Sequence, residues 1–312
     1  MPTAPNKNII PNEEEYPDTK RILSHLSSLI DEMVNFGSWI FGWCLEKKLK
    51  GDYYAAPIIL YRRSLELLDS ISLLIKSSSV APCKVMLRSL FETMMFLEYM
   101  TQDDFENRGR DFILCVKHKE LYLLRQHLPE DPLYKEYIPK FSRDNLAKYI
   151  PIPRIPDLKA KIAVKMEFVN SSFYTSSQES YQAIAKQRKS RSPKWWFNLH
   201  GGPNDLKDLA DKLNRPLQYE VLYREWAGYA HGTGSFDGQV EVAGPETLKI
   251  IQLRLPENAE FITMLTLGFE TTIFKTMINQ YAKEREPELS AWFEAELKEE
   301  IEKLKNTRIF VI

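Results

Sequence analysis

ILSHLSSLIDEMVNF, residues 22–36, is the stretch that decides how this chain folds, because its apolar side chains recur at helical intervals. The apolar positions are Ile22, Leu23, Leu26, Leu29, Ile30, Met33, Val34 and Phe36. This spacing predicts a helix that begins near Pro17 and continues to Lys50, where Gly51 is a typical stop. Residues 1–16, which are polar and flanked by prolines, are expected to form a flexible arm.

Three more helices are predicted directly after the first. Asp52 can cap the second, and Pro82 falls in the first turn of the third. The predicted bounds of the three are 52–76, 82–100 and 103–128. Because short connections imply antiparallel neighbours, we predict that residues 17–128 form the four-helix core of an all-α, up-and-down helical bundle.

The rest of the chain is predicted to complete a single helical domain over residues 17–312. Residues 129–204 are divided into short pieces by prolines at 129, 132, 139, 151, 153, 156 and 193, which predicts an irregular helical insertion with one helix near 157–169. Helical patterns return at 205–213, 217–231 and 256–283, and alternation at 239–255 suggests a small β-hairpin. Residues 205–285 therefore hold a motif helix and a return helix, and 286–312 a C-terminal helix.

Composition excludes several classes of function. The 42 Lys and Arg nearly cancel the 43 Asp and Glu, so no global basic field attracts nucleic acid and any such contact must be local. No glycine-rich phosphate loop or dinucleotide fingerprint occurs. Four of the five histidines, His25, His118, His127 and His200, lack metal-ligand spacing. We predict no metal and no cofactor.

The cysteines and the apolar pattern indicate a cytoplasmic protein. Cys44, Cys83 and Cys115 are scattered within apolar helical patterns, without the paired spacing of a disulfide framework. The amino terminus lacks a basic segment followed by an apolar run, and no uninterrupted apolar stretch reaches the roughly 18 residues that a spanning helix needs. Neither secretion nor membrane insertion is indicated.

Arg224 and His231 are the candidate catalytic residues. They lie seven residues apart in LQYEVLYREWAGYAH, residues 217–231, and two helical turns would place both side chains on one face. In RNA cleavage without a metal, His231 would take the proton from a 2′-hydroxyl and Arg224 would stabilise charge on the phosphate. The alternative is that both are satisfied structural groups of a core helix.

Arg88 and Glu92 are predicted to support this pair. They lie four residues apart within the otherwise almost wholly apolar run 85–97. A buried ion pair is costly to desolvate, so it indicates either a structural or an active-site role. Near Tyr223, the two would line the pocket of His231 or orient its ring. An internal salt bridge that sets helix register is the alternative.

A basic segment runs into three aromatic residues. Residues 186–194 contain five basic side chains, and Trp195, Trp196 and Phe197 follow directly. This composition suits phosphate attraction and base stacking on single-stranded nucleic acid. A basic loop beside a hydrophobic anchor explains the same residues.

The pair Arg224 and His231, with polar Glu225 directly after the arginine, resembles the Arg-x4-6-His motif of the HEPN superfamily. That resemblance implies an all-α, dimeric, metal-independent ribonuclease of toxin, phage-defence or RNA-processing systems. It implies RNA as the partner, and Arg224 and His231 as a catalytic pair assembled with their symmetry mates across a homodimer interface. An antitoxin or another regulatory protein is a further expected partner.

A second resemblance covers about residues 55–235. The chain resembles an uncharacterised bacterial family of unknown function in the segments Arg88-Ser-Leu-Phe-Glu92, Trp195, Leu206-Lys-Asp-Leu-Ala210, Tyr219, Tyr223 and His231-Gly232. This resemblance implies no activity.

The sequence thus predicts a HEPN-like, metal-independent endoribonuclease with His231 as general base and Arg224 as phosphate ligand. Arg88, Glu92 and Tyr223 are its predicted supporting or substrate-binding residues. A non-catalytic helical module that binds a nucleotide or a protein at the same place is the second interpretation. In a third, the polar residues serve only the architecture of the core.

Overall fold

A computed structural model describes residues 10, 16–47, 51–144, 148–149, 154–187, 195–224, 226–231 and 252–304, and the backbone alone of 240–244 and 247–250. Contacts divide the chain into two compact units. Unit 1 contains the described parts of 1–50, 57–103 and 206–312, and unit 2 those of 51–56 and 104–205. Nearly all of the predicted arm lies outside the described residues.

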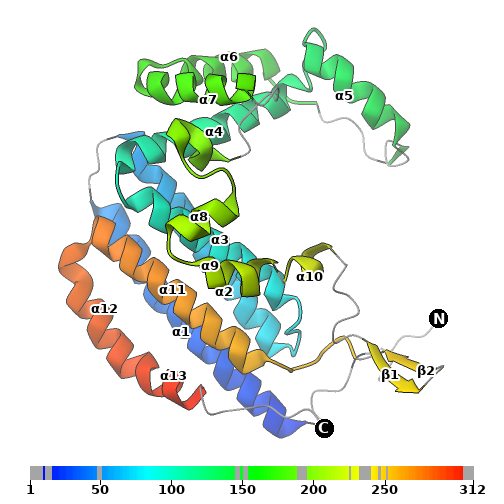
Figure 1. Cartoon of the computed structure of the whole chain (residues 1–312), viewed down its shortest axis with the longest axis vertical. Coiled ribbons are helices and arrows are strands. Elements are labelled where there is room, and N and C mark those ends of the chain that lie inside the picture. The colour runs from blue at the N-terminus through cyan, green and yellow to red at the C-terminus, as the bar shows by residue number, and fades with distance from the viewer. Residues whose placement is uncertain are drawn as a thin grey trace. The chain divides into compact units, whose positions relative to one another are not determined.

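Unit 1 is built around a helical bundle, which confirms the predicted all-α class. Its long helices are α1 (Pro17–Glu46), α2 (Ala55–Lys76), α3 (Cys83–Thr101) and α11 (Ala259–Tyr281). Figure 1 shows α11 running along both α1 and α3, with which it makes its most extensive contacts. The ring centroids of Phe91 on α3 and Phe269 on α11 lie 5.5 Å apart.

Gly37 allows α1, α2 and α11 to approach closely. A β-carbon at this position would lie 2.5 Å from the Leu65 side chain and 3.0 Å from the Phe274 ring, which is closer than atoms normally approach. The Tyr61 hydroxyl donates to the Gly37 carbonyl over 2.8 Å, so the same position also carries a buried link between α1 and α2. A side chain here would force the helices apart.

Glu270 is a fully buried carboxyl group at the centre of this bundle. It lies on α11, and its Oε1 accepts a hydrogen bond from the Ser64 hydroxyl of α2 over 3.0 Å. Its Oε2 is buried without a hydrogen-bond partner. Burial raises the pKa of Glu270 from 4.5 to about 8, although the Ser64 hydroxyl opposes this shift. The carboxyl group is therefore protonated in the folded protein at neutral pH.

The predicted four-helix core differs from the observed bundle in its last helix. The sequence places residues 103–128 in that core, but α4 (Phe105–Arg125) belongs to unit 2, and α11 packs with α1 and α3 in unit 1. Helical periodicity identifies an apolar face without identifying the helix that covers it. In unit 2 the apolar face of α4 is covered by α6 and α7, which follow it in the sequence.

The later helices of unit 1 are short. They are α8 (Leu206–Lys212), α9 (Pro216–Gln218), α10 (Ala227–His231), α12 (Glu286–Trp292) and α13 (Lys298–Leu304), and a π-helical stretch joins the last two. The hairpin predicted within 239–255 is present as β1 (Val240–Gly244) and β2 (Thr247–Ile250), which pair antiparallel with Val240 opposite Ile250.

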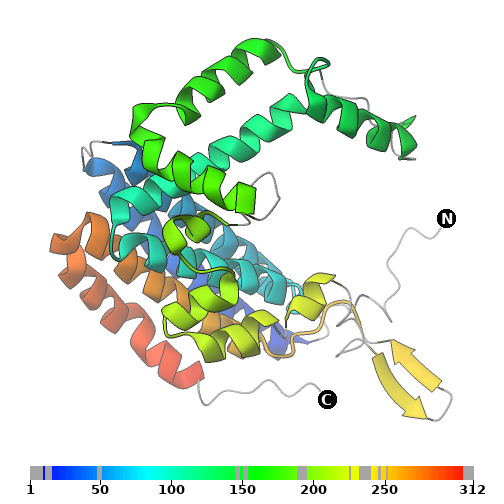
Figure 2. The same ribbon diagram turned by 45° about the horizontal axis from the view of Figure 1, so that its top comes forward.

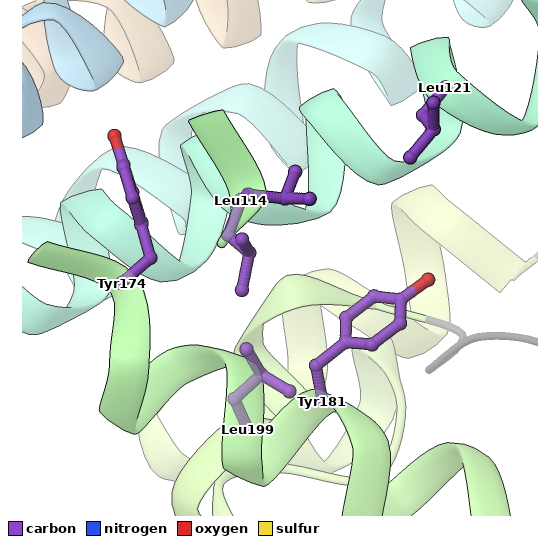
Figure 3. Packing of buried hydrophobic residues seen from close by; sticks show 6 residues of the cluster. Leu114, Leu121, Tyr174, Tyr181 and Leu199 are labelled. Atoms are coloured by element: carbon purple, nitrogen blue, oxygen red, sulfur yellow. The ribbon is translucent and has the colours of Figure 1, made fainter. Parts of the chain in front are cut away.

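Unit 2 consists of α4 with α5 (Pro132–Arg143), α6 (Leu158–Val169) and α7 (Thr175–Gln187), and Figure 2 shows α4 in turquoise and the other three in green. Both α6 and α7 pack against α4. Its apolar cluster contains Leu114, Leu121, Val169, Tyr174, Tyr181 and Leu199 (Figure 3). The described part of residues 129–204, which the sequence predicts as a helical insertion, thus packs against α4 and forms one unit with it.

Within the described residues, α11 alone is long and apolar enough to cross a membrane. More than half of the tested window, 56%, is buried inside the protein. Its contacts with α1 and α3 account for this burial. We therefore identify α11 as the central helix of the bundle.

Candidate functional site

The segment from Arg215 to His231 carries the candidate catalytic residues, and an ion pair with α3 fixes its first residue. The guanidinium of Arg215 donates from Nε to Glu98 Oε2 over 2.6 Å and from Nη2 to Glu98 Oε1 over 2.5 Å. Both side chains are less than one-fifth exposed. Two parallel charge-assisted hydrogen bonds make this a strong and directional pair. Arg215 also donates to the Gln218 side chain, which joins the start of α9 to the same anchor.

The rest of the segment is not the single continuous helix that the sequence predicts. After α9, residues Tyr219–Arg224 are π-helical, Trp226 lies in a turn, and α10 begins at Ala227. A π-helix has wider turns than an α-helix. The expected alignment of Arg224 and His231 on one face over two regular turns therefore does not apply across this break.

Arg224 is the exposed cation of the π-helical stretch. Its side chain is 73% exposed, and Nη1 donates to Glu220 Oε2 over 2.9 Å. This hydrogen bond to the Glu220 carboxylate raises the pKa of Arg224, so the guanidinium is always charged. One hydrogen bond leaves the guanidinium fork with donors that an incoming oxyanion can accept from.

His231 ends α10 and is exposed. Among the described residues, no hydrogen bond or ion pair joins it to Arg224 or to another side chain. Its imidazole is therefore accessible from solvent, as a group that exchanges protons with a substrate must be. The structure thus places both predicted catalytic residues on the surface without a direct link between them.

The predicted supporting residues are brought together by α3. Arg88 Nη2 donates to the Tyr223 hydroxyl over 2.7 Å, and the guanidinium carbon lies 4.1 Å from the centre of the Tyr223 ring. Glu92 Oε1 lies 3.9 Å from Arg88 Nε, so the Glu92 carboxylate is the nearest opposite charge to this guanidinium on α3. Burial raises the pKa of Tyr223 to about 12, and the Glu92 carboxylate adds to this effect, whereas Arg88 opposes it. The three side chains form one network beneath the π-helical stretch.

Lys84 makes a second link of the same kind, which sequence reasoning missed. Its Nζ donates to the Tyr229 hydroxyl of α10 over 2.7 Å and lies 3.9 Å from the centre of that ring. Lys84 precedes Arg88 by four residues, so both stand on one face of α3. Extending the Arg88 and Glu92 spacing by one helical turn would have found this lysine, although not its partner.

These two links position the candidate catalytic residues indirectly. Tyr223, held by Arg88, directly precedes Arg224, and Tyr229, held by Lys84, lies two residues before His231. A hydrogen bond combined with a cation–π contact fixes both the hydroxyl and the plane of each ring. The backbone beside each exposed side chain is therefore anchored to α3, while the side chain itself remains free to meet a ligand.

The other sequence candidates show no comparable arrangement. Of the basic segment 186–194, only Lys186 and Gln187 are described, so its predicted phosphate contacts lie outside the described residues. Trp196 and Phe197, which follow it, are buried, as the alternative of a hydrophobic anchor expects. His118 is bound to Gln178, and His200 faces Asp111, both within unit 2. No group of three His, Cys, Asp or Glu side chains that could hold a metal ion occurs in the described part of the chain.

Comparison with known proteins places the chain in a family without assigning it a reaction. No curated protein and no solved structure matches it. A family described as a family of unknown function, DUF5677, matches residues 54–241. The match covers more than half of the chain and includes α3, with Lys84, Arg88 and Glu92, and the whole segment from Arg215 to His231. The chain therefore belongs to the DUF5677 family.

Proposed function

We propose that this protein is a metal-independent endoribonuclease of the cytoplasm whose active site contains Arg224 and His231. The observation that carries the proposal is that both side chains are exposed while the residues beside them are anchored to α3 through Tyr223 and Tyr229. The likeness of this pair to the Arg-x4-6-His motif of HEPN ribonucleases supplies the reaction class. The free cysteines Cys44, Cys83 and Cys115 suit a reducing compartment.

In the proposed reaction, neutral His231 accepts the proton of a ribose 2′-hydroxyl. The 2′-oxygen attacks the adjacent phosphorus, the bond from phosphorus to the 5′-oxygen breaks, and the departing oxygen takes a proton from water. The hydroxide that remains takes the proton from His231, which is then neutral again. Arg224 stabilises the negative charge that builds on the phosphate oxygens. The product strand ends in a 2′,3′-cyclic phosphate, and neither an oxidant nor a metal is consumed.

The decisive experiment compares His231→Ala with wild type on a panel of single-stranded RNAs in the presence of a chelator. We expect cleavage to fall about 100- to 10,000-fold, because a positioned general base contributes that much. His25→Ala is a matched control, since His25 is also partly exposed but is bound to Glu300. Intact RNA after incubation with wild type, or undiminished cutting by His231→Ala, would refute the proposal. Toxicity on overexpression that depends on His231 would support a toxin or phage-defence role.

We further propose that two copies form the active enzyme. Leu217 and Val221 are 74% and 44% exposed, and they are four residues apart on the segment that leads to Arg224. An exposed apolar pair of this kind can meet its own copy across a two-fold axis. Mixing Arg224→Ala with His231→Ala tests the arrangement, because a site that takes one residue from each copy regains activity in the mixed dimer.

The second candidate function is a non-catalytic module that binds a nucleotide or a regulatory protein such as an antitoxin. The break at Trp226 favours it, because regular helical geometry does not hold Arg224 and His231 together. Saturable binding of an RNA without any turnover, unchanged by His231→Ala, would favour this function over the nuclease.

A further inference from the structure

Glu220 lies between two cations that come from different elements of unit 1. Its Oε2 accepts the hydrogen bond of 2.9 Å from Arg224, and its Oε1 lies 4.0 Å from Nζ of Lys207 on α8. Each carboxylate oxygen therefore faces one cation. Lys207 and Arg224 are 17 positions apart in the sequence, so no helical spacing relates them.

Two cations that converge on one carboxylate can also bind one phosphate. A backbone phosphodiester has a single negative charge shared by two non-bridging oxygens, as a carboxylate has. We propose that Lys207 and Arg224 bind one phosphate of the RNA backbone, and that Glu220 occupies this place until RNA displaces it. This inference rests on the proposed function and adds to it a second phosphate ligand and an internal competitor.

Exposure makes the displacement feasible. The side chains of Lys207, Glu220 and Arg224 are 57%, 40% and 73% exposed, and ion pairs at such exposure contribute little to stability. The guanidinium gains by the exchange, because its fork matches two phosphate oxygens. Glu220 remains tethered one helical turn away and repels the bound phosphate, so it lowers affinity for every RNA.

The pair of Arg215 and Glu98 shows why Arg224, rather than Arg215, takes this role. Both oxygens of Glu98 are bound by the same guanidinium, and both side chains are less than one-fifth exposed. A ligand would have to replace two short hydrogen bonds at a site that water barely reaches. Arg215 is therefore a structural residue, although it lies on the same segment.

The experiment measures binding to a fluorescent single-stranded RNA with 2′-O-methyl riboses, which lacks the attacking hydroxyl and cannot be cleaved. We expect Glu220→Gln to tighten the dissociation constant by about two- to fivefold, the range that one exposed charge pair supports. Lys207→Gln should weaken binding by a similar factor and lower the slope of log affinity against log salt concentration by about 0.7 to 1.

Glu66→Gln is the matched control, because Glu66 pairs with Arg62 four residues before it, over 2.7 Å, at similar exposure. It should leave binding unchanged. An unchanged or weaker affinity in Glu220→Gln overturns the inference, as does an unchanged salt slope in Lys207→Gln or a failure of all variants to bind. Cleavage of unmodified RNA is scored separately, so an inactive protein that still shows the Glu220 effect refutes the nuclease alone.

Discussion

The two arginines of the segment from Arg215 to His231 differ in their hydrogen bonds and in their exposure. Arg215 is fastened to Glu98 of α3 by two hydrogen bonds and is largely withdrawn from solvent. Arg224 has one bond, to Glu220 on its own turn, and is mostly exposed. An arginine paired with a glutamate is thus structural at one end and available to a ligand at the other. Burial and the number of hydrogen bonds distinguish the two roles.

Glu270 extends this comparison to a buried carboxyl group that has no cation beside it. Among the predictions, we expect its titration to have the largest effect on the free energy of unfolding. Its folded pKa of about 8 exceeds the ordinary 4.5, so the stability it contributes is full below pH 4.5 and is lost as pH rises toward 8. The loss amounts to about 1.4 kcal/mol per pH unit, or roughly 4 to 5 kcal/mol over this window.

Glu270→Gln removes this titration, so its free energy of unfolding relative to wild type should rise with pH over the same window. Denaturant unfolding at several pH values measures the difference in free energy of unfolding between the variant and wild type. The other carboxyl groups titrate in both proteins, so their contributions cancel in this difference. A constant difference between Glu270→Gln and wild type would contradict the proposed protonation.

Arg215→Ala should give the next largest loss of stability. It leaves Glu98 charged, mostly buried and without its two hydrogen bonds, which costs about 2 to 3 kcal/mol. Arg215→Lys should recover part of this loss, because a lysine keeps the charge but cannot form the two parallel bonds. Urea unfolding of wild type, Arg215→Lys and Arg215→Ala measures whether their stabilities fall in this order. Equal stability of Arg215→Ala and wild type would mean that Arg215 is no anchor.

Tyr223→Phe tests the network that holds the exposed end. The change removes the hydroxyl that accepts the hydrogen bond from Arg88, and should cost about 1 to 2 kcal/mol. If this layer positions Arg224, RNA cleavage should fall as well. Tyr122→Phe, at a 39% exposed tyrosine of unit 2, is the control. A loss of stability with full cleavage would confine Tyr223 to a structural role.

Most of the helices could be predicted from the sequence because each depends on a local pattern. The spacing around residues 22–36, the stop at Gly51 and the predicted bounds 52–76 place α1 and α2 within a few residues of their observed bounds. The choice of α11 rather than α4 for the bundle depends on which apolar faces meet across more than 150 residues. No local period contains that information.

The site, too, could be predicted from the sequence only where it depends on local spacing. The four-residue spacing of Arg88 and Glu92 identified a polar pair within an apolar helix, and Tyr223 was expected near it. The pairs of Lys84 with Tyr229 and of Glu98 with Arg215 join residues more than 100 positions apart, so no spacing reveals them. The π-helical stretch was also missed, since the helical pattern continues through Tyr219–Arg224 and gives no sign of wider turns.

Arg224→Ala should have the smallest effect on stability and completes the comparison of the two arginines. Its single exposed bond to Glu220 makes little difference to folding, so urea unfolding should match wild type. RNA cleavage should nevertheless fall strongly, because the variant lacks the guanidinium that is proposed to stabilise the charge on the phosphate. Arg62→Ala, which removes a similarly exposed partner of Glu66, controls for the loss of a surface cation and should keep full activity. If Arg224→Ala unfolds as easily as Arg215→Ala, both arginines are structural, and exposure does not distinguish their roles on this segment.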